Sequence, residues 1–364
     1  MDKESLDRRI SAVLKNAGVG IILLVNTNSE DPNFIYMTDL RGGLFEGNFL
    51  LISKKGATLF TSPLEYELAK GQLSNKIKIV NLDSTEKVEL LERELKGKEI
   101  GINGNFLPYN SLRRIKKRFK LGKIVDVSNA FEEARRIKDN GEISRIRMAN
   151  KITKNAIAKV QAELKVGMTE KEVARRFGNY ILEYGADGTS FDSIVCFGKN
   201  SALPHHAPDM TKLKHGDLVL IDVGVKVGNY CSDVTRTIIF GDPKVPIKDY
   251  EKKKRIIQVV KEAQAAAIAS IKQGVAGKTP HLVASGIIDR ADGGAYKGSF
   301  IHSLGHSIGI EVHDGSGRFL SPESELVLKA GMVSSVEPGI YIPGFGGARI
   351  EDDVLVTENG ALIL

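Results

Sequence analysis

An apolar run at residues 218–223 contains one charged residue, and this contrast is the strongest signal in the hydrophobic pattern of the chain. The run, Leu-Val-Leu-Ile-Asp-Val, has the length and composition of a buried strand, so it predicts that Asp222 lies among apolar side chains. An unpaired carboxylate in such surroundings costs several kcal/mol. The charge of Asp222 must therefore be compensated by another group. The next carboxylate in the segment, Asp233, follows a turn signal at residues 226–229.

We expect the segments on either side of this turn to pair as an antiparallel hairpin. Folding the chain back between Val227 and Gly228 makes Asp222 face Asp233, and directly opposed residues have Cβ atoms about 4.5–5.5 Å apart. Two like charges at that separation repel in an apolar setting unless a cation joins them. The hairpin therefore predicts a metal site, against the alternatives that Asp222 caps a turn and that Asp233 pairs with Arg236.

Two later strands repeat this arrangement. Residues 332–336 form a predicted strand with Glu337 at its end, directly before a Pro-Gly turn, and Glu351 lies inside a second predicted strand. A simple polar strand end at residues 351–353 is the alternative for Glu351. It is disfavoured because the apolar residues 354–356 continue the strand.

Histidines cluster in one segment of the second half. Of seven histidines, His302, His306 and His313 fall within twelve positions, and two glycines between them permit close approach of backbone or ligand. A single histidine there is more often a hydrogen-bonded core residue, but three in a segment with few other polar groups favour a functional site. Neutral imidazole is a common ligand for zinc and related ions.

The predicted metal ligands are four carboxylates and one imidazole: Asp222, Asp233, His306, Glu337 and Glu351. This set suits two divalent ions about 3.5–4 Å apart with bridging carboxylates. The oxygen-rich shell disfavours copper(I) and a structural zinc site, and leaves manganese, cobalt, zinc or iron. Two ions sharing a water generate a bridging hydroxide and polarise a carbonyl, which predicts metal-assisted hydrolysis. Glu337 is the expected base that passes the proton to the leaving nitrogen.

The remaining pattern predicts two domains. Short strands alternate with helices in the first third, which indicates an α/β domain without catalytic residues, and the 364-residue length exceeds the ~250–300 residues of a single core. We place the domains at residues 1–127 and 128–364. In the second, helical spacing and a capping box at residues 169–172 predict helices near residues 143–164, 170–184, 247–272 and 279–292.

The composition of the chain limits its expected partners and cellular compartment. The formal charge of +7 permits nucleic-acid contact, and residues 113–123 hold seven cations, but the helical spacing of Leu112, Ile115 and Phe119 favours a solvated helix face. Two cysteines in no paired motif argue against a disulfide framework. No apolar run approaches the ~20 residues of a membrane span, and the N-terminus has no apolar signal core. The reducing cytoplasm fits best, with no membrane partner.

At these residues the chain resembles the metallopeptidases of the pita-bread fold, namely aminopeptidase P, Xaa-Pro dipeptidase (prolidase) and methionine aminopeptidase. The matching segments lie within residues 137–358 and include Pro204-His205, Leu220–Gly224, Ser232–Thr237, Gly305–Gly309, Val312–Asp314, Val336–Tyr341 and Arg349–Asp352. The resemblance implies an α+β pita-bread catalytic domain in which Asp233 and Glu351 bridge two ions. Asp222 would hold one ion, and His306 and Glu337 the other.

The resemblance also assigns the surroundings of these ligands. It implies that His205, His302 and His313 line the substrate cleft and steady the intermediate, so that His205 and His313 are catalytic. Tyr341 and Arg349 match supporting or substrate-side positions. Residues 1–127 resemble the N-terminal domain of the prolidase and aminopeptidase P branch, which closes the cleft or forms the dimer in those relatives, so a homodimer is expected.

The predicted function is a dimetal exopeptidase that hydrolyses Xaa-Pro peptides. An Xaa-Pro bond has no N–H, so metal ions and histidines must replace contacts that other peptidases make to that donor. A dipeptidase also needs a cation for the C-terminal carboxylate of its substrate, and we expect Arg318 to supply it. The choice between a dipeptidase and an aminopeptidase stays open.

Three alternatives are weaker. The positive charge is consistent with a non-catalytic relative that binds nucleic acid or protein. The complete set of five metal ligands argues against this alternative, so no nucleic-acid partner is expected. The same set argues against a metal-free amidinohydrolase of the creatine type. A methionine aminopeptidase is disfavoured by the long N-terminal domain.

Overall fold

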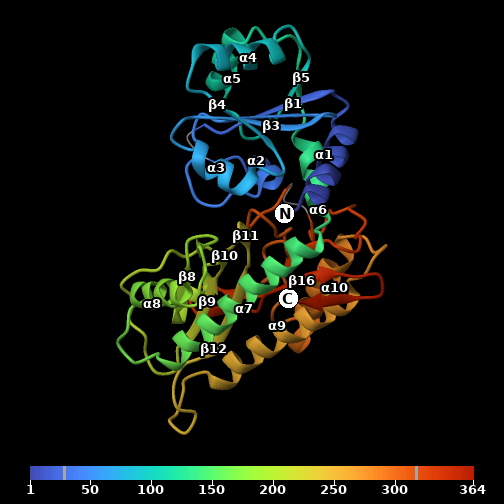
Figure 1. Cartoon of the computed structure of the whole chain (residues 1–364). Coiled ribbons are helices and arrows are strands. Elements are labelled where there is room, and N and C mark those ends of the chain that lie inside the picture. The colour runs from blue at the N-terminus through green and yellow to red at the C-terminus, as the bar shows by residue number, and fades with distance from the viewer. Residues whose placement is uncertain (28–29, 316–318) are drawn as a thin grey trace. The chain divides into compact units, whose positions relative to one another are not determined.

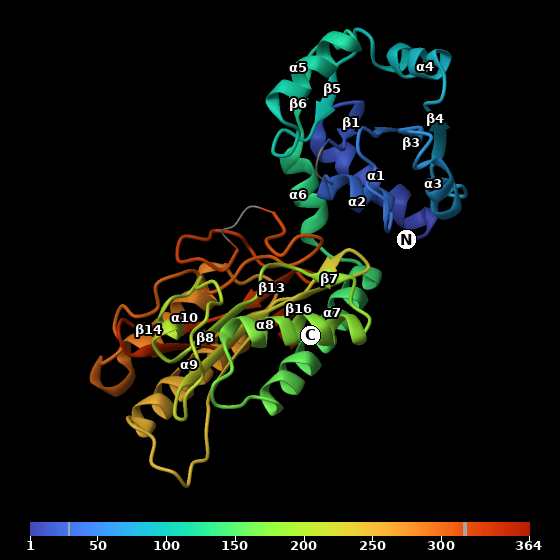
Figure 2. The same ribbon diagram turned by 90° about the vertical axis from the view of Figure 1, so that its left-hand side faces the viewer.

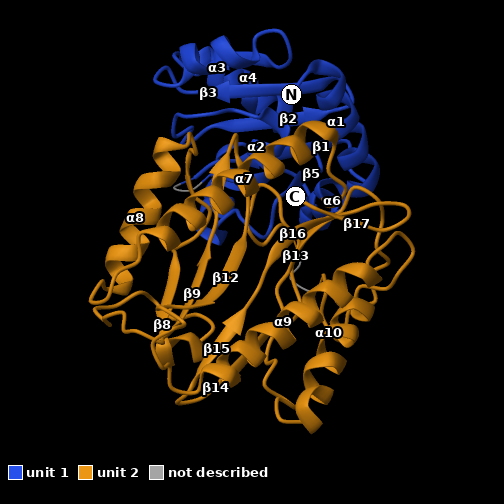
Figure 3. Cartoon of the chain, turned by 90° about the horizontal axis from the view of Figure 1, so that it is seen from below, with its two compact units in different colours: residues 1–135 blue, residues 136–364 orange. Residues whose placement is uncertain are grey.

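The computed structural model describes residues 1–27, 30–315 and 319–364. The chain forms two compact units, residues 1–135 and 136–364 (Figure 3). The division falls near the end of helix α6 (Ser128–Arg136), whose Phe131 side chain is fully buried. The predicted boundary after Val127 instead assigns this helix to the second unit.

The first unit is a mixed six-stranded sheet with the strand order β4-β3-β2-β1-β5-β6. The pairs β1–β2 and β2–β3 are antiparallel, and the other three pairs are parallel. Its strands are β1 (Ile21–Val25), β2 (Phe49–Ser53), β3 (Gly56–Thr61), β4 (Lys78–Asn81), β5 (Ile100–Ile102) and β6 (Ile124–Asp126). Besides α6, its helices are α1 (Lys3–Ala17), α2 (Pro32–Thr38), α3 (Tyr66–Leu73), α4 (Thr85–Leu95) and α5 (Tyr109–Arg118).

Both faces of this sheet are covered, as expected of an α/β unit. Leu23 and Val25 of β1 pack into a core with α4 and α5, while α1 and α2 lie on the opposite face (Figure 1). Helix α5 carries the basic segment. Its Leu112 and Ile115 join this core together with Phe119, and its arginines and lysines are exposed, so the expected solvated helix face is what the structure contains.

The second unit consists of two halves, each with its own apolar core. In the first half, α7 (Asn140–Ala162) and α8 (Glu170–Glu183) pack on the sheet β12-β9-β8, and in the second, α9 (Tyr250–Ser270) and α10 (Lys278–Arg290) pack on the strands near the C-terminus. Figure 3 shows these strands between α8 on one side and α9 and α10 on the other, and Figure 2 shows the same unit with α8 towards the viewer. The first half contains β7 (Gly188–Thr189), β8 (Ile194–Phe197), η1 (Gly198–Ala202), β9 (Leu218–Val223), β10 (Val225–Val227), β11 (Tyr230–Cys231) and β12 (Val234–Ile239). The second contains η2 (Ala291–Gly293), β13 (Val333–Val336), β14 (Gly339–Ile342), β15 (Gly346–Arg349), β16 (Asp352–Val356) and β17 (Ala361–Ile363).

Hydrogen bonds join the halves between β12 and the segment from β15 to β16. Glu351 N donates to Thr235 O at 3.1 Å, and Arg349 N donates to Thr237 Oγ1 at 3.2 Å. The four long helices lie within a few residues of their predicted bounds. Helix α8 begins with the expected capping box between Thr169 and Glu172. Among the described residues, no helix is long and apolar enough to cross a membrane.

The register predicted for the first hairpin is wrong by two residues. Val227 pairs with Tyr230, which leaves Gly228 and Asn229 as a two-residue turn with φ of 54° and 72°. Positive φ at both central residues is the mark of a type I′ turn, whose twist matches that of the strands. Asp222 therefore faces Thr235 directly, not Asp233. Because the shift is even, both acids still point to one face of the sheet.

Candidate active site

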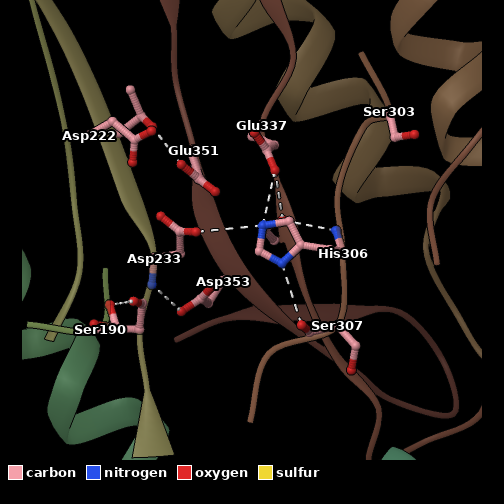
Figure 4. A network of polar contacts seen from close by, with 12 residues as sticks. Ser190, Asp222, Asp233, Ser303, His306, Ser307, Glu337, Glu351 and Asp353 are labelled. Atoms are coloured by element: carbon pink, nitrogen blue, oxygen red, sulfur yellow. Dashed lines mark hydrogen bonds and ion pairs between the residues drawn. The ribbon is translucent and has the colours of Figure 1, made fainter. Parts of the chain in front are cut away.

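The five predicted metal ligands converge from both halves of the second unit, as Figure 4 shows. Asp222 lies in β9 and Asp233 directly before β12, whereas Glu337 follows β13 and Glu351 precedes β16. The Nε2 atom of His306 lies 3.5 Å from Asp233 Oδ2 and 3.3 Å from Glu337 Oε1. Ligand atoms of Asp233, His306 and Glu351 all lie within 4.8 Å of one another.

Three carboxylate oxygens in this cluster have no hydrogen-bond donor in the part of the chain that the structure describes. Asp222, Asp233 and Glu351 are only 7%, 6% and 1% exposed, and within the described parts of the chain no group donates to Asp222 Oδ1, Asp233 Oδ1 or Glu351 Oε1. Buried polar atoms nearly always have a partner. Carboxylate oxygens together with an imidazole nitrogen are ligands for hard and borderline divalent cations, so these residues fit the predicted ions.

The protonation equilibria reflect the crowding of charge. Burial and the neighbouring Asp222 raise the pKa of Asp233, and burial and Asp233 raise the pKa of Glu351. Burial acts in the same direction on Glu337, but its contact with His306 dominates and lowers its pKa to about 2. Conversely, the two carboxylates raise the pKa of His306 against the effect of burial. The cluster thus needs protons or cations to offset its negative charge.

Arg349 supplies one positive charge beside the cluster. The residue is only 2% exposed, and its guanidinium donates from Nη2 to Asp222 Oδ2 and from Nη1 to the Tyr341 hydroxyl at 2.6 Å. Its Nε donates to Thr235 Oγ1 at 3.2 Å. The Tyr341 hydroxyl in turn lies 2.8 Å from His302 Nε2, and His302 Nδ1 lies 2.8 Å from Ser303 O. Arg349 and Tyr341 therefore connect Asp222 to His302.

A cleft of about 430 Å³ opens over the cluster. His205, His302 and His313, which were expected beside the substrate, all line it, and the ring centroids of His306 and His313 are 4.0 Å apart. The described residues lining it are Phe191, Ile194, Pro204, His205, Asp222, Asp233, His302, Ser303, Gly305, His306, Val312, His313, Glu337 and Arg349. Arg318, predicted to bind a carboxylate, lies outside the described residues.

The sequence patterns did not single out three side chains that support the cluster. Thr235 Oγ1 donates to Glu351 Oε2, and Ser335 Oγ donates to Glu337 Oε1 at 3.1 Å while accepting from His306 N at 3.0 Å. Asp353 Oδ2 accepts from Asp233 N at 3.0 Å and from Asn150 Nδ2 at 2.7 Å. Strand alternation offers one usable signal, since it places Thr235 on the face of Asp233.

The chain matches the model of metallopeptidase family M24 over residues 144–358 and that of the creatinase/prolidase N-terminal domain over residues 8–137. It is 37% identical over 334 residues to an Xaa-Pro dipeptidase of Pyrococcus horikoshii, covering 92% of this chain and 90% of that protein. Among solved structures, it resembles an Xaa-Pro dipeptidase from Bacillus anthracis, with a TM-score of 0.86, 32% identity and coverage of 100% and 97%. An X-Pro aminopeptidase from Thermotoga maritima gives a TM-score of 0.87, 31% identity and coverage of 96% of each chain.

The fold and the acidic cluster together define a metal-dependent hydrolase. The chain belongs to metallopeptidase family M24, and its first unit is a creatinase/prolidase N-terminal domain. This membership confirms the expected fold class, an α/β domain followed by an α+β pita-bread catalytic domain, and it implies divalent metal ions.

Proposed function

We propose that this protein is an exopeptidase that hydrolyses Xaa-Pro peptide bonds with two divalent metal ions. The convergence of five ligand-type side chains beneath one cleft carries this proposal, together with three buried carboxylate oxygens that have no donor among the described residues. The similarity to proteins named Xaa-Pro dipeptidase and X-Pro aminopeptidase extends over almost the whole chain and supports the substrate class.

We assign the ligands as the resemblance implies. Asp233 and Glu351 would bridge the two ions, Asp222 would hold one, and His306 and Glu337 the other. Manganese, cobalt, zinc and iron all suit these donors. When bound, such ions lower the pKa of a shared water and polarise the scissile carbonyl.

The side chains of the chain itself would move the proton and orient the substrate. Glu337, held by Ser335 and His306, would accept a proton at its carboxylate and deliver it to the prolyl nitrogen as that atom leaves. This delivery matters because the nitrogen of an Xaa-Pro bond carries no hydrogen of its own. His205 and His313 would donate hydrogen bonds to the oxygen of the reacting carbonyl.

The apolar part of the cleft suits the rest of the substrate. Phe191, Ile194, Pro204 and Val312 line it and can exclude water from a prolyl ring or from the preceding side chain. His302, held by Tyr341, would contact the substrate beside them, and we keep Tyr341 and Arg349 as substrate-side residues that act through their contacts with His302 and Asp222. Arg318 remains the proposed partner of a dipeptide's carboxylate.

We further propose a homodimer that works in the cytoplasm. The buried free thiols of Cys196 and Cys231 fit a reducing compartment. Light scattering behind a sizing column measures the mass of the assembly and would show a dimer at twice the 39.7 kDa of the chain.

Metal-stripped protein provides the decisive test. We expect no hydrolysis of an Xaa-Pro dipeptide or an Xaa-Pro-Yaa tripeptide until manganese, cobalt, zinc or iron is added back singly. A preference for the dipeptide that is lost in Arg318→Ala identifies a dipeptidase, and a strong tripeptide preference unchanged in that variant identifies an aminopeptidase. Cleavage of neither substrate with any of these metals would overturn the proposed function.

A further inference from the structure

Another buried carboxylate, that of Glu170, lies in the same unit outside the ligand cluster. Glu170 is the first residue of α8 and is fully buried. Its Oε1 accepts hydrogen bonds from Phe197 N at 2.7 Å and from Asn200 Nδ2 at 2.9 Å. Its Oε2 accepts from His206 Nε2 at 2.8 Å and from Asp209 N at 3.1 Å. The carboxylate thus holds four donors from one remote segment, residues 197–209.

This segment carries two residues that line the cleft. His206 N donates to Leu203 O at 3.2 Å, which closes a β-turn with Pro204 and His205 at its two central positions. Proline favours the first central position because its φ is already fixed near the required value. The turn therefore presents Pro204 and His205 to the cleft, and its last residue, His206, is bonded to Glu170.

The surroundings of Glu170 suit an anchor. Lys171 N donates a hydrogen bond to Asp209 O, and Glu170 N donates one to Thr211 O, each at 3.2 Å. The backbone after the turn is therefore also hydrogen-bonded to the start of α8. A carboxylate at a helix N-terminus is stabilised by the helix dipole. At the other end of the turn, Leu203 N donates to Asn200 O at 2.9 Å, and Asn200 is itself bonded to Glu170.

The same groups are poorly suited to a second metal site. Glu170, His206 and Asp209 offer ligand atoms within 4.8 Å of one another. However, an ionised carboxylate has about four acceptor positions, and four donors already occupy those of Glu170. A cation would have to displace these donors, so the arrangement favours a mechanical role.

We propose that Glu170 is a positioning residue, which sets His205 at the cleft by anchoring both ends of the turn that carries it. This inference rests on the proposed function, in which His205 contacts the reacting carbonyl. Small displacements of such a group are costly, since a shift of about 1 Å can lower a rate about 100-fold.

The substitution Glu170→Gln tests this proposal. It keeps the shape of the side chain but replaces one acceptor oxygen by an NH₂ group, which cannot accept hydrogen bonds from the donors in residues 197–209. We expect kcat/KM for the preferred substrate, whether the Xaa-Pro dipeptide or the Xaa-Pro-Yaa tripeptide, to fall about 10- to 100-fold. In a His205→Ala background the same substitution should change kcat/KM less than about threefold, because the residue through which Glu170 acts is gone. An equal loss in both backgrounds would overturn the proposal.

Glu172→Gln is the matched control in the same helix turn. Glu172 Oε2 accepts from Thr169 N and Thr169 Oγ1, so the substitution removes a negative charge from the start of α8 without removing a bond to residues 197–209. We expect kcat/KM within about twofold of wild type. A loss in Glu172→Gln as large as that in Glu170→Gln would show that helix stability, not the anchor, sets the rate.

Hydrogen exchange tests the anchor without any activity. In Glu170→Gln, amides of residues 197–209 should exchange faster, while those of residues 302–314 and the metal content of the protein stay unchanged. Unchanged exchange at residues 197–209 would overturn the proposal that Glu170 anchors this segment, even if the protein is an active peptidase. Faster exchange in a protein without peptidase activity would support the anchoring role and contradict only the proposed function. If Glu170→Gln does not fold, His206→Ala removes one donor and should show the same dependence on His205.

Discussion

Arg349 and Asp222 form a buried ion pair, although Asp222 is also a predicted metal ligand. Removing one partner of a buried pair leaves an uncompensated charge and costs about 3–5 kcal/mol. We expect Arg349→Met to destabilise metal-free protein by about this amount in urea denaturation. With metal bound the loss should be smaller, because cations also neutralise Asp222. Arg349→Lys should recover part of the stability, and an equal loss with and without metal would contradict the prediction.

Asp233→Asn should have opposite effects on metal binding and on metal-free stability. The variant loses a proposed bridging ligand, so metal content measured by mass spectrometry should fall. It also removes like-charge repulsion from a buried cluster, and metal-free protein should gain on the order of 1 kcal/mol in free energy of unfolding at pH 7. Asp83→Asn, at an exposed position, is the control and should change neither.

The pH dependence of that gain has a defined sign. Burial and the neighbouring Asp222 raise the pKa of Asp233, so folded metal-free protein binds more protons at this residue than the unfolded chain does above pH ~4. Wild type loses stability relative to Asp233→Asn as pH rises through this window. Denaturation of both proteins from pH 4 to 8 should show a widening gap, and a constant gap would refute the assignment.

Thr235→Val tests the support of Glu351. The substitution keeps the side-chain shape but removes the hydroxyl that donates to Glu351 and accepts from Arg349. Leaving such buried groups unsatisfied costs about 1–3 kcal/mol, which thermal denaturation should reveal. Thr235→Ser retains the hydroxyl and should stay near wild type, so a similar loss in both variants would assign the effect to packing.

The hairpin turn gives a local test of the observed register. Gly228 has a φ of 54°, and a side chain in this left-handed conformation costs about 1–2 kcal/mol. Gly228→Ala should therefore lower the denaturation midpoint, whereas Asn229→Gly, which suits the φ of 72°, should not. A turn centred between Val227 and Gly228 would place these two residues at the central positions, so Val227→Gly would then stabilise the protein, which the observed register does not predict.

Both cysteines should be inert in the folded protein. Cys196 and Cys231 are completely buried, and burial raises the pKa of both thiols, that of Cys231 to about 12. A thiol-specific dye should therefore label neither residue in native protein and both in guanidinium chloride. Rapid native labelling would show that the region around one of these cysteines opens.

Local periodicity explains what the sequence could predict here. The contrast between Asp222 and its apolar neighbours identified β9, and the same contrast found Glu337 and Glu351. The register of the hairpin was missed because the positive φ of Asn229 placed the turn one residue later than expected, which shifts the pairing by two. The error left the acids together because it was even.

The supporting contacts could not be predicted from such patterns. Thr235 and Glu351 are 116 residues apart, and Asn150 and Asp353 are 203 apart, so no local period relates them. Glu170 was likewise predicted only as part of a helix start, because its four donors come from a segment that reaches it through the tertiary fold.

The predicted metal ligands come from both halves of the second unit, so metal binding depends on the packing of the two halves against each other. Asp222 and Asp233 come from one half, and His306, Glu337 and Glu351 come from the other. Neither half alone contains all five predicted ligands. A chain in which one half is unfolded should therefore release its metal ions. Hydrolysis of Xaa-Pro peptides would thereby be confined to molecules in which both halves of the second unit are folded.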